Sequence, residues 1–126
     1  MDEAAQYLED NAKKESVVVL ESGLQYLVIE SGDGATPTKR NSVKTHYAGR
    51  LIDGTPFDSS YDRGEPLTFG VTQVIAGWTE ALQLMKEGDK WELTIPADLA
   101  YGSAGAGGAI GPNQTLVFDI KLIEVI

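Results

Sequence analysis

The 126-residue sequence predicts an α+β fold, in which a strongly twisted antiparallel β-sheet wraps around one short α-helix, with an additional helix at the N-terminus. Three observations lead to this prediction. Short β-rich runs separated by Gly, Pro, Asp and Asn begin at Val17 and continue to the C-terminus. A helical repeat of apolar residues interrupts these runs, and a narrower one precedes them. The length suits a single domain with one core.

The N-terminal residues, from about Glu3 to Ser16, carry a thin apolar stripe at helical spacing. Its apolar or small members, set among Glu, Asp, Lys and Asn, are Ala4, Ala5, Leu8 and Ala12, with Tyr7 beside them. Because such a stripe buries little, we expect the helix to pack on the main body, to extend a longer helix, or to meet a partner chain. We therefore divide the chain into an N-terminal helical segment, residues 1–16, and a main domain, residues 17–126.

The first half of the main domain has the rhythm of antiparallel strands and turns. Val17–Leu20 and Leu24–Glu30 are predicted strands, and residues 31–37 are dense in turn formers and predict a loop. A third strand alternates, with Val43, Thr45 and Tyr47 on one face and Lys44 and His46 on the other. Leu51–Thr55 contains Asp-Gly, which indicates a tight hairpin turn.

The second half contains the clearer helix and two further strands. Ile75, Trp78, Leu82 and Met85 recur at helical spacing, and Gly88 stands where a C-terminal glycine cap belongs. Two alternating runs predict strands with one face toward the core. The first has Trp91, Leu93 and Ile95 on that face. The second has Leu116, Phe118, Ile120 and Leu122 on that face, and Val117, Asp119 and Lys121 on the other. Between them Ala100–Asn113, rich in glycine and nearly uncharged, predicts a long loop of the kind that is usually functional.

Composition excludes several classes of function. The net charge of -9 argues against a nucleic-acid partner, which would need clustered Lys and Arg. The absence of cysteine excludes disulfides, thiolate metal sites and a cysteine nucleophile, and it is compatible with a reducing or an oxidising compartment. No run approaches the ~20 apolar residues of a membrane span. The acidic start, Met1-Asp2-Glu3, is unlike a secretory signal, and we expect no membrane insertion.

The sequence lacks the motifs of most catalytic chemistries. The single histidine, His46, lies within a predicted strand and no Gly-x-Ser-x-Gly elbow exists, so a Ser-His-Asp hydrolase is not supported. No phosphate-binding loop is present, and the run Gly105–Ile110 breaks the dinucleotide fingerprint by ending in isoleucine. The acidic residues do not have the spacing of a calcium loop. We expect no cofactor and no metal.

Aromatic residues near turns are the feature that these exclusions leave: Tyr47, Phe57, Tyr61, Phe69, Trp78, Trp91, Tyr101 and Phe118. Most would be core residues, and we assign Trp91 to the core. An aromatic-lined hollow is also what a proline ring needs, because the ring is apolar, has no N–H, and offers its carbonyl as the only strong polar group.

Six segments, in order and at matching spacing, resemble the FKBP family of peptidyl-prolyl cis-trans isomerases: Val43–Gly49, Asp53–Ser60, Val74–Trp78, Gly88–Pro96, Ala100–Gly102 and Thr115–Asp119. The resemblance covers about Gly23 to Ile126. It implies a half-barrel sheet on one short helix, and an enzyme that rotates X-Pro bonds and assists protein folding. A non-catalytic peptide-binding or chaperone module is the chief alternative, and a structural or adhesive β-domain is a third. The retained pocket aromatics favour the enzyme.

The resemblance also implies the site residues. Trp78 would be the floor of the pocket, and the walls would be Tyr47, Phe57, Val74, Ile75, Tyr101 and Phe118, with Leu67 and Phe69 also binding the ligand. Asp58 would pair with Arg63, and it either meets polar groups of the substrate or forms a buried salt bridge that shapes the pocket. The N–H of Ile110 would donate to the ligand beside the Tyr101 hydroxyl. The rim departs from many members at Leu67, Ala106, Ala109 and Gly111-Pro112, which implies a smaller, looser rim.

Partners follow from the same resemblance. They are proline-containing polypeptides, and macrolide inhibitors such as rapamycin. Asn11–Glu15, Glu21–Tyr26 and Gly77–Leu82 look similar to the bacterial branch that includes the macrophage infectivity potentiators, whose members dimerise through a helical N-terminal arm. We expect a monomer for this chain and a homodimer for a longer parent protein. The sequence is compatible with a location in the bacterial cytoplasm or the periplasm.

Overall fold

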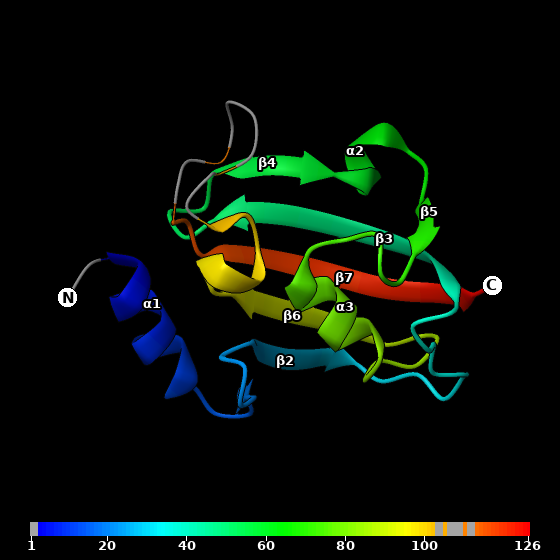
Figure 1. Cartoon of the computed structure of the whole chain (residues 1–126), viewed down its shortest axis with the longest axis horizontal. Helices are drawn as coiled ribbons and strands as arrows, with labels where there is room; N and C mark the ends of the chain where they lie inside the picture. Colours follow the sequence, from blue (N-terminus) through cyan, green and yellow to red (C-terminus); the bar gives the residue numbers. More distant parts are fainter. Residues whose placement is uncertain (1–2, 103–104, 106–109, 111–112) are drawn as a thin grey trace.

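The computed structural model describes residues 3–102, 105, 110 and 113–126 (Figure 1). Its elements, in chain order, are α1 (Glu3–Ala12), β1 (Val18–Val19), β2 (Gln25–Glu30), β3 (Ser42–Leu51), β4 (Pro56–Ser59), α2 (Ser60–Arg63), β5 (Leu67–Gly70), α3 (Ala76–Leu82), β6 (Lys90–Ile95), the 3-10 helix η1 (Ala97–Leu99) and β7 (Leu116–Val125). In this part of the chain, none of the helices has the length and apolar character that crossing a membrane requires.

The seven strands form one antiparallel sheet in the order β1-β2-β6-β7-β3-β4, with β5 also paired to β3. The long strand β3 pairs along its length with β7 on one side. On its other side it pairs first with β5, over Ser42–Thr45, and then with β4, over Ala48–Arg50. The neighbour of β3 therefore changes in mid-strand, at residues 46–47.

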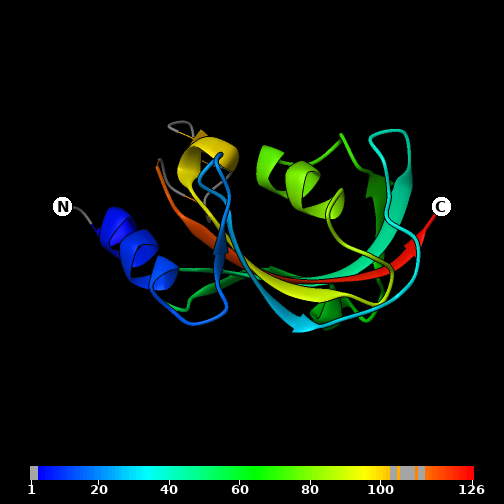
Figure 2. The ribbon, with the colours of Figure 1, turned by 90° about the horizontal axis from the view of Figure 1, so that it is seen from below.

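The helix α3 lies inside the curve of the sheet, and the core forms between them (Figure 2). Trp78, Ala81 and Leu82 are the buried side chains of the helix. They share one apolar cluster with the inner-face residues of β6 and β7, which are Trp91, Leu93, Ile95, Leu116, Phe118, Ile120 and Leu122. The predicted α+β fold and the predicted alternation of these strands are confirmed.

The helix α1 packs on the opposite, outer face of the sheet. Asn11 Nδ2 donates to Gln25 Oε1 at 2.7 Å and to Thr94 Oγ1 at 3.2 Å, and Gln25 Nε2 donates to the carbonyl of Leu8 at 2.9 Å. Thr94 pairs in register with Val117, which the alternation put on this face, and both are buried. Of the three arrangements expected for the N-terminal helix, contact with the main body is therefore observed.

The predicted end of the central helix is wrong. The helix stops at Leu82, with Gln83 as a right-handed cap, and Gly88 lies beyond it in the turn that enters β6. Gly88 has a φ of 96°, and a Cβ there would lie 3.0 Å from the Cα of Gly32. Glycine is needed for this turn and this close approach, and it does not cap the helix.

Two other elements are shorter than predicted, and three elements, α2, β5 and η1, were missed. The N-terminal helix stops at Ala12, and the first strand is only Val18–Val19. The four-residue elements α2 and β5 were not predicted, because a single turn or a short edge strand leaves no periodic pattern to detect. The hairpin between β3 and β4 is confirmed, since Leu51 and Thr55 are joined by a backbone hydrogen bond of 2.9 Å.

Candidate active site

A cavity of about 410 Å³ opens between α3 and the strands β3, β4 and β5. Its size lies within the range of small-ligand sites, roughly 300–1,000 Å³. Its walls come from sequence positions that span more than half of the chain: Tyr47, Phe57, Asp58, Leu67, Gln73, Val74, Ile75, Trp78, Tyr101 and Phe118. One charged residue stands among mostly apolar and aromatic ones, so the cavity suits an apolar group with a polar attachment.

The aromatic rings meet edge to face. The Trp78 ring has its centroid 5.1 Å from that of Tyr47, at an interplanar angle of 75°, and 5.0 Å from that of Phe118, at 86°. Phe57 meets Phe118 in the same way, at 5.4 Å and 87°. This geometry is favourable for aromatic quadrupoles. It also leaves space that parallel stacking would fill, so the buried indole of Trp78 forms the base of an open hollow.

Gly49 on β3 allows Phe57 and Phe118 to meet. A Cβ at this position would lie 2.6 Å from Cε1 of Phe118 and 2.7 Å from Cζ of Phe57, closer than real contacts allow. The two rings therefore occupy the space that a side chain on β3 would take. Any larger residue at Gly49 would push one ring out of the cavity wall.

Three polar side chains at the rim form a closed network. The Tyr47 hydroxyl donates to Asp58 Oδ2 at 2.7 Å, Arg63 Nη2 donates to the same hydroxyl at 2.7 Å, and Arg63 Nη1 donates to Asp58 Oδ1. The predicted pairing of Asp58 with Arg63 is confirmed, but the alternative in which this salt bridge is buried is wrong. The side chains of Arg63 and Asp58 are 48% and 42% exposed.

The network sets the protonation states of its members. Burial raises the pKa of Tyr47, and its hydrogen bond to Asp58 raises it further, against the opposing influence of Arg63. Partial burial acts to raise the pKa of Asp58, but the hydrogen bond from Tyr47 and the hydrogen bond and charge of Arg63 outweigh it, so the pKa is lowered. At neutral pH the rim therefore holds a carboxylate, a guanidinium and a neutral phenol.

Ser60 fixes the backbone of Tyr47 where β3 changes its neighbour. The fully buried hydroxyl of Ser60 accepts from the Tyr47 N–H at 2.7 Å and donates to the Tyr47 carbonyl at 3.2 Å. It replaces the strand that is missing at this point of the edge. His46 Nδ1 lies 2.9 Å from the same hydroxyl, and the His46 ring stacks on Tyr61 at 4.6 Å. Sequence reasoning missed Ser60, because its role depends on the gap between β4 and β5.

Nine of the twelve residues predicted for the site line the cavity: Tyr47, Phe57, Asp58, Leu67, Val74, Ile75, Trp78, Tyr101 and Phe118. The other three are placed differently. Arg63 contacts the rim through Asp58 and Tyr47, and Phe69 does not line the cavity, although its ring centroid is 5.5 Å from that of Trp78. Ile110 is buried in the core cluster and is not among the lining residues.

Gln73 lines the cavity and was missed. Its Oε1 accepts from the N–H of Gly70 at 2.8 Å, so the side chain closes the turn that follows β5. The available signal was its place between a glycine turn and Val74. Four predicted rim positions, Ala106, Ala109, Gly111 and Pro112, lie outside the described residues.

The lining residues offer binding rather than bond-making chemistry. Their titratable groups are Asp58 and the phenols of Tyr47 and Tyr101. Within the described ranges, no three His, Asp or Glu side chains gather as a metal ligand set. Such a site can hold an apolar ring in dry surroundings and present a few polar groups beside it.

Comparison with known proteins gives a consistent result along the whole chain. Residues 34–123 match the family of FKBP-type peptidyl-prolyl cis-trans isomerases, and residues 1–28 match the domain that is amino-terminal to such isomerases. The chain is 58% identical over 124 residues to the FKBP-type 22 kDa peptidyl-prolyl cis-trans isomerase of Escherichia coli (strain K12), over 98% of this chain and 60% of that protein.

Solved structures agree with the sequence comparisons. The crystal structure of FkpA from Escherichia coli is similar with a TM-score of 0.93 and 48% identity, over 97% of this chain and 57% of that one. The peptidyl-prolyl cis-trans isomerase structure from Pseudomonas syringae pv. tomato has a TM-score of 0.91 and 41% identity, over 97% and 90%. The chain spans 60%, 51% and 44% of the length of three curated relatives that it matches.

Proposed function

This chain belongs to the FKBP-type peptidyl-prolyl cis-trans isomerases, and we propose that it accelerates rotation about X-Pro peptide bonds in unfolded or partly folded polypeptides. The observation that carries the proposal is the cavity itself. A hollow of about 410 Å³ has the indole of Trp78 in its wall, beside Tyr47 and Phe118, and most of its other lining residues are apolar or aromatic. It supplies apolar contact and few competing polar groups.

The reaction requires neither a nucleophile nor a metal. An X-Pro bond rotates slowly because rotation breaks amide resonance, with a barrier of about 18–20 kcal/mol. A site accelerates the rotation if it binds the twisted amide better than either planar form. A twisted amide has a more ketone-like, less polar carbonyl, which a dry aromatic site favours relative to water. Each ~1.4 kcal/mol of this preference gives a tenfold rate increase.

The lining residues divide into two groups in this proposal. Trp78, Tyr47 and Phe118 hold the pyrrolidine ring, because they form the edge-to-face base of the hollow. Phe57 and Tyr101 flank the rotating carbonyl. Tyr101 is suited to this position since its side chain lines the cavity while remaining 38% exposed, within reach of an entering chain. The hydrogen bond proposed for the N–H of Ile110 would add an anchor beyond the ring.

We propose that Asp58 is a positioning residue. Both of its oxygens already accept hydrogen bonds, one from Tyr47 and one from Arg63. It therefore holds the Tyr47 ring at the side of the hollow, and its charge stands at the rim without being needed for proton transfer. Of the two roles that the sequence left open for Asp58, this proposal favours shaping the pocket.

Further proposals concern the ligands, the domain division and the oligomeric state. FKBP isomerases act on proline-containing polypeptides and bind macrolides, and we propose both kinds of ligand for this cavity. We also propose that the N-terminal segment and the main domain divide between residues 16 and 17. We propose that this chain is a monomer and that a longer parent protein is a dimer. The matching amino-terminal family over residues 1–28 is compatible with such an arm.

The test measures cis-trans exchange of a short Leu-Pro peptide by NMR, with and without the chain, with rapamycin, and with Asp58→Ala. We expect acceleration by the wild type, loss of it with a stoichiometric amount of rapamycin, and partial loss in the variant. A folded wild-type chain that binds the peptide without accelerating exchange would support the binding-module alternative. Absence of both binding and acceleration would reject the cavity as a proline site.

A further inference from the structure

A second hollow, of about 630 Å³, lies on the other side of the segment 72–76 from the first cavity. The two hollows share Val74 as a lining residue. Gln73 and Ile75 line the first hollow, while Thr72 and Ala76 line the second. A single stretch of backbone is therefore the wall between them, and its side chains face the two sides in turn.

Three polar side chains of the second hollow, which we call the α3 groove, are already hydrogen-bonded within the protein. The groove continues over Thr79, Glu80, Gln83 and Leu84. Thr79 Oγ1 donates to the carbonyl of Val71 at 2.8 Å, Gln83 Nε2 donates to the carbonyl of Thr79 at 2.8 Å, and Glu80 accepts from Ser22 Oγ at 2.6 Å. Leu84, in contrast, leaves 46% of its surface exposed. The groove suits a neutral, partly apolar occupant.

The wall carries free backbone groups. Neither the N–H nor the C=O of Val74 makes a hydrogen bond with another described residue. An extended polypeptide that crosses Val74 could pair with these groups, as a strand pairs with an edge. A wall one backbone thick is about 5 Å wide, and an extended chain covers ~3.3 Å per residue. About two residues beyond the X-Pro bond would bring such a chain into the groove.

We propose that the α3 groove is a subsite for the substrate polypeptide, which binds the residues that lie about three or more positions from the X-Pro bond and favours neutral, apolar ones. The proposal rests on the proposed isomerase function of the neighbouring cavity. Continuity with that cavity through Val74 is what identifies the occupant as the same polypeptide chain. Lys39 and Glu80, which also line the groove, carry opposite charges and leave it without a net preference for a charged segment.

The test compares two peptides with the same Leu-Pro bond. One has four residues, and the other extends those four by four neutral, apolar residues on each side. Three proteins are used: the wild type, Leu84→Glu, and Val19→Glu as the control, which adds the same charge at a similarly exposed position on β1. We expect a KM for the long peptide about fivefold lower than for the short one. Leu84→Glu should remove this difference and leave kcat/KM for the short peptide unchanged within twofold, while Val19→Glu should change neither.

A binding measurement separates this proposal from the proposed function. The methyl NMR signals of Leu84 should shift on titration with the long peptide and not with the short one, whether or not exchange is accelerated. If neither peptide is accelerated but these signals shift, the isomerase function fails and the groove remains a peptide site. The subsite would be overturned if the wild type had equal KM values for the two peptides, or if the Leu84 signals did not shift with the long peptide. It would also be overturned if the signals shifted with protein concentration alone, because the groove would then bind a second copy of the chain.

Discussion

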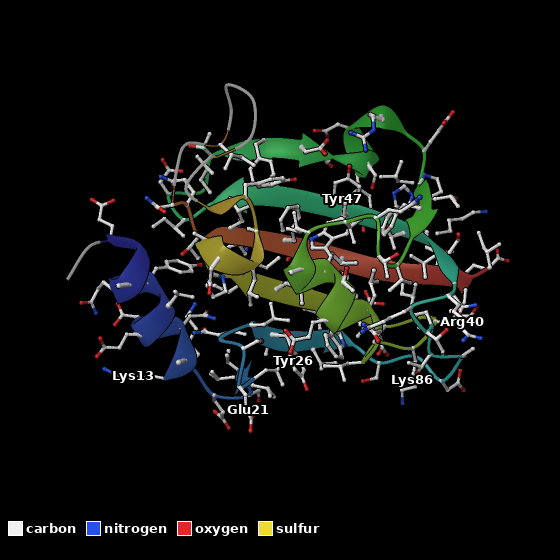
Figure 3. All side chains as sticks on the ribbon, in the orientation of Figure 1. Lys13, Glu21, Tyr26, Arg40, Tyr47 and Lys86 are labelled. Carbon is white, nitrogen blue, oxygen red and sulfur yellow. The ribbon has the colours of Figure 1, made fainter. Side chains whose placement is uncertain are left out.

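The two tryptophans of this chain are equally buried and do different things. Trp78 and Trp91 are each 5% exposed, and neither indole N–H has a hydrogen-bond acceptor among the described residues. Trp91 stacks on Tyr26 with ring centroids 4.0 Å apart and planes 7° from parallel. Trp78 instead meets its neighbours at steep angles, and a cavity opens beside it. Figure 3 shows Tyr26 and Tyr47, the tyrosines of the two clusters, on opposite sides of α3.

Burial alone therefore does not separate a structural aromatic from a functional one in this fold. In the parallel pair on β2 and β6 each ring covers one face of the other, and neither ring lines the cavity. The edge-to-face group borders the cavity instead, since Gly49 gives Phe57 and Phe118 the space to meet in its wall and the bond to Asp58 holds the Tyr47 hydroxyl at the rim. The first cluster should thus control stability, and the second should control activity.

The largest expected effect comes from breaking the stacked cluster. Trp91→Ala removes a buried indole from the core and should lower the free energy of unfolding by about 4 kcal/mol. The folded fraction should keep kcat/KM within twofold, because the cavity does not include this residue. Urea unfolding and the peptide exchange assay measure the two quantities. A loss of activity per folded molecule would contradict the separation of the clusters.

Ser60 tests how the open cluster is supported. Ser60→Ala leaves the buried N–H and carbonyl of Tyr47 without their partner and should cost about 2 kcal/mol of stability. It should also lower kcat more than it raises KM, since Tyr47 would shift in the cavity wall. Ser59→Ala is the matched control, because the Ser59 hydroxyl only accepts a capping hydrogen bond of 3.4 Å from the Asp62 N–H. Equal losses in both variants would show that Ser60 has no specific role.

Phe57→Ala sharpens the comparison from the side of activity. Phe57 is half-buried and packs on Phe118 in the cavity wall. Its removal should lower kcat/KM about tenfold, equivalent to ~1.4 kcal/mol of lost transition-state binding. The stability loss should be smaller than that of Trp91→Ala. If the order of the two stability losses were reversed, the wall would be a structural core like the stacked cluster.

The smallest expected effect is on the acid side of the stability curve. Because the pKa of Asp58 is lowered in the folded state, its contribution to stability is present above its ordinary pKa of about 3.9 and is lost as the pH falls through the lower folded value. Solvent screening at this exposed pair keeps the contribution below about 1 kcal/mol. The stability difference between wild type and Asp58→Asn should shrink between pH 5 and pH 2. A constant difference would mean that the network does not bind the carboxylate.

The parts of the fold that repeat along the chain were predictable. Alternation placed the inner faces of β3, β6 and β7 correctly, and the Asp-Gly pair placed the hairpin after Leu51. The same alternation could not show that Thr94 and Val117 are buried on the outer face, because that depends on where α1 docks. The end of the central helix was also misjudged, since a glycine needed for a turn resembles a glycine cap.

The candidate site divides in the same way. Aromatic residues were predictable because a proline site needs them and the family pattern aligns them with Tyr47, Phe57, Trp78 and Phe118. Gln73 and Ser60 were not, because each acts through a backbone group that only the folded chain brings near. Ile110 is buried in the core cluster and is not among the lining residues, although its sequence position suggested the rim.

The most direct test of the central claim is the activity of Tyr101→Ala measured beside its stability. Tyr101 lines the cavity and is exposed, so its truncation should leave the free energy of unfolding within about 0.5 kcal/mol of the wild type. The account predicts a roughly tenfold fall in kcat/KM for a Leu-Pro peptide at this unchanged stability. A variant that isomerises the peptide as fast as the wild type would contradict the assignment of the reaction to this cavity.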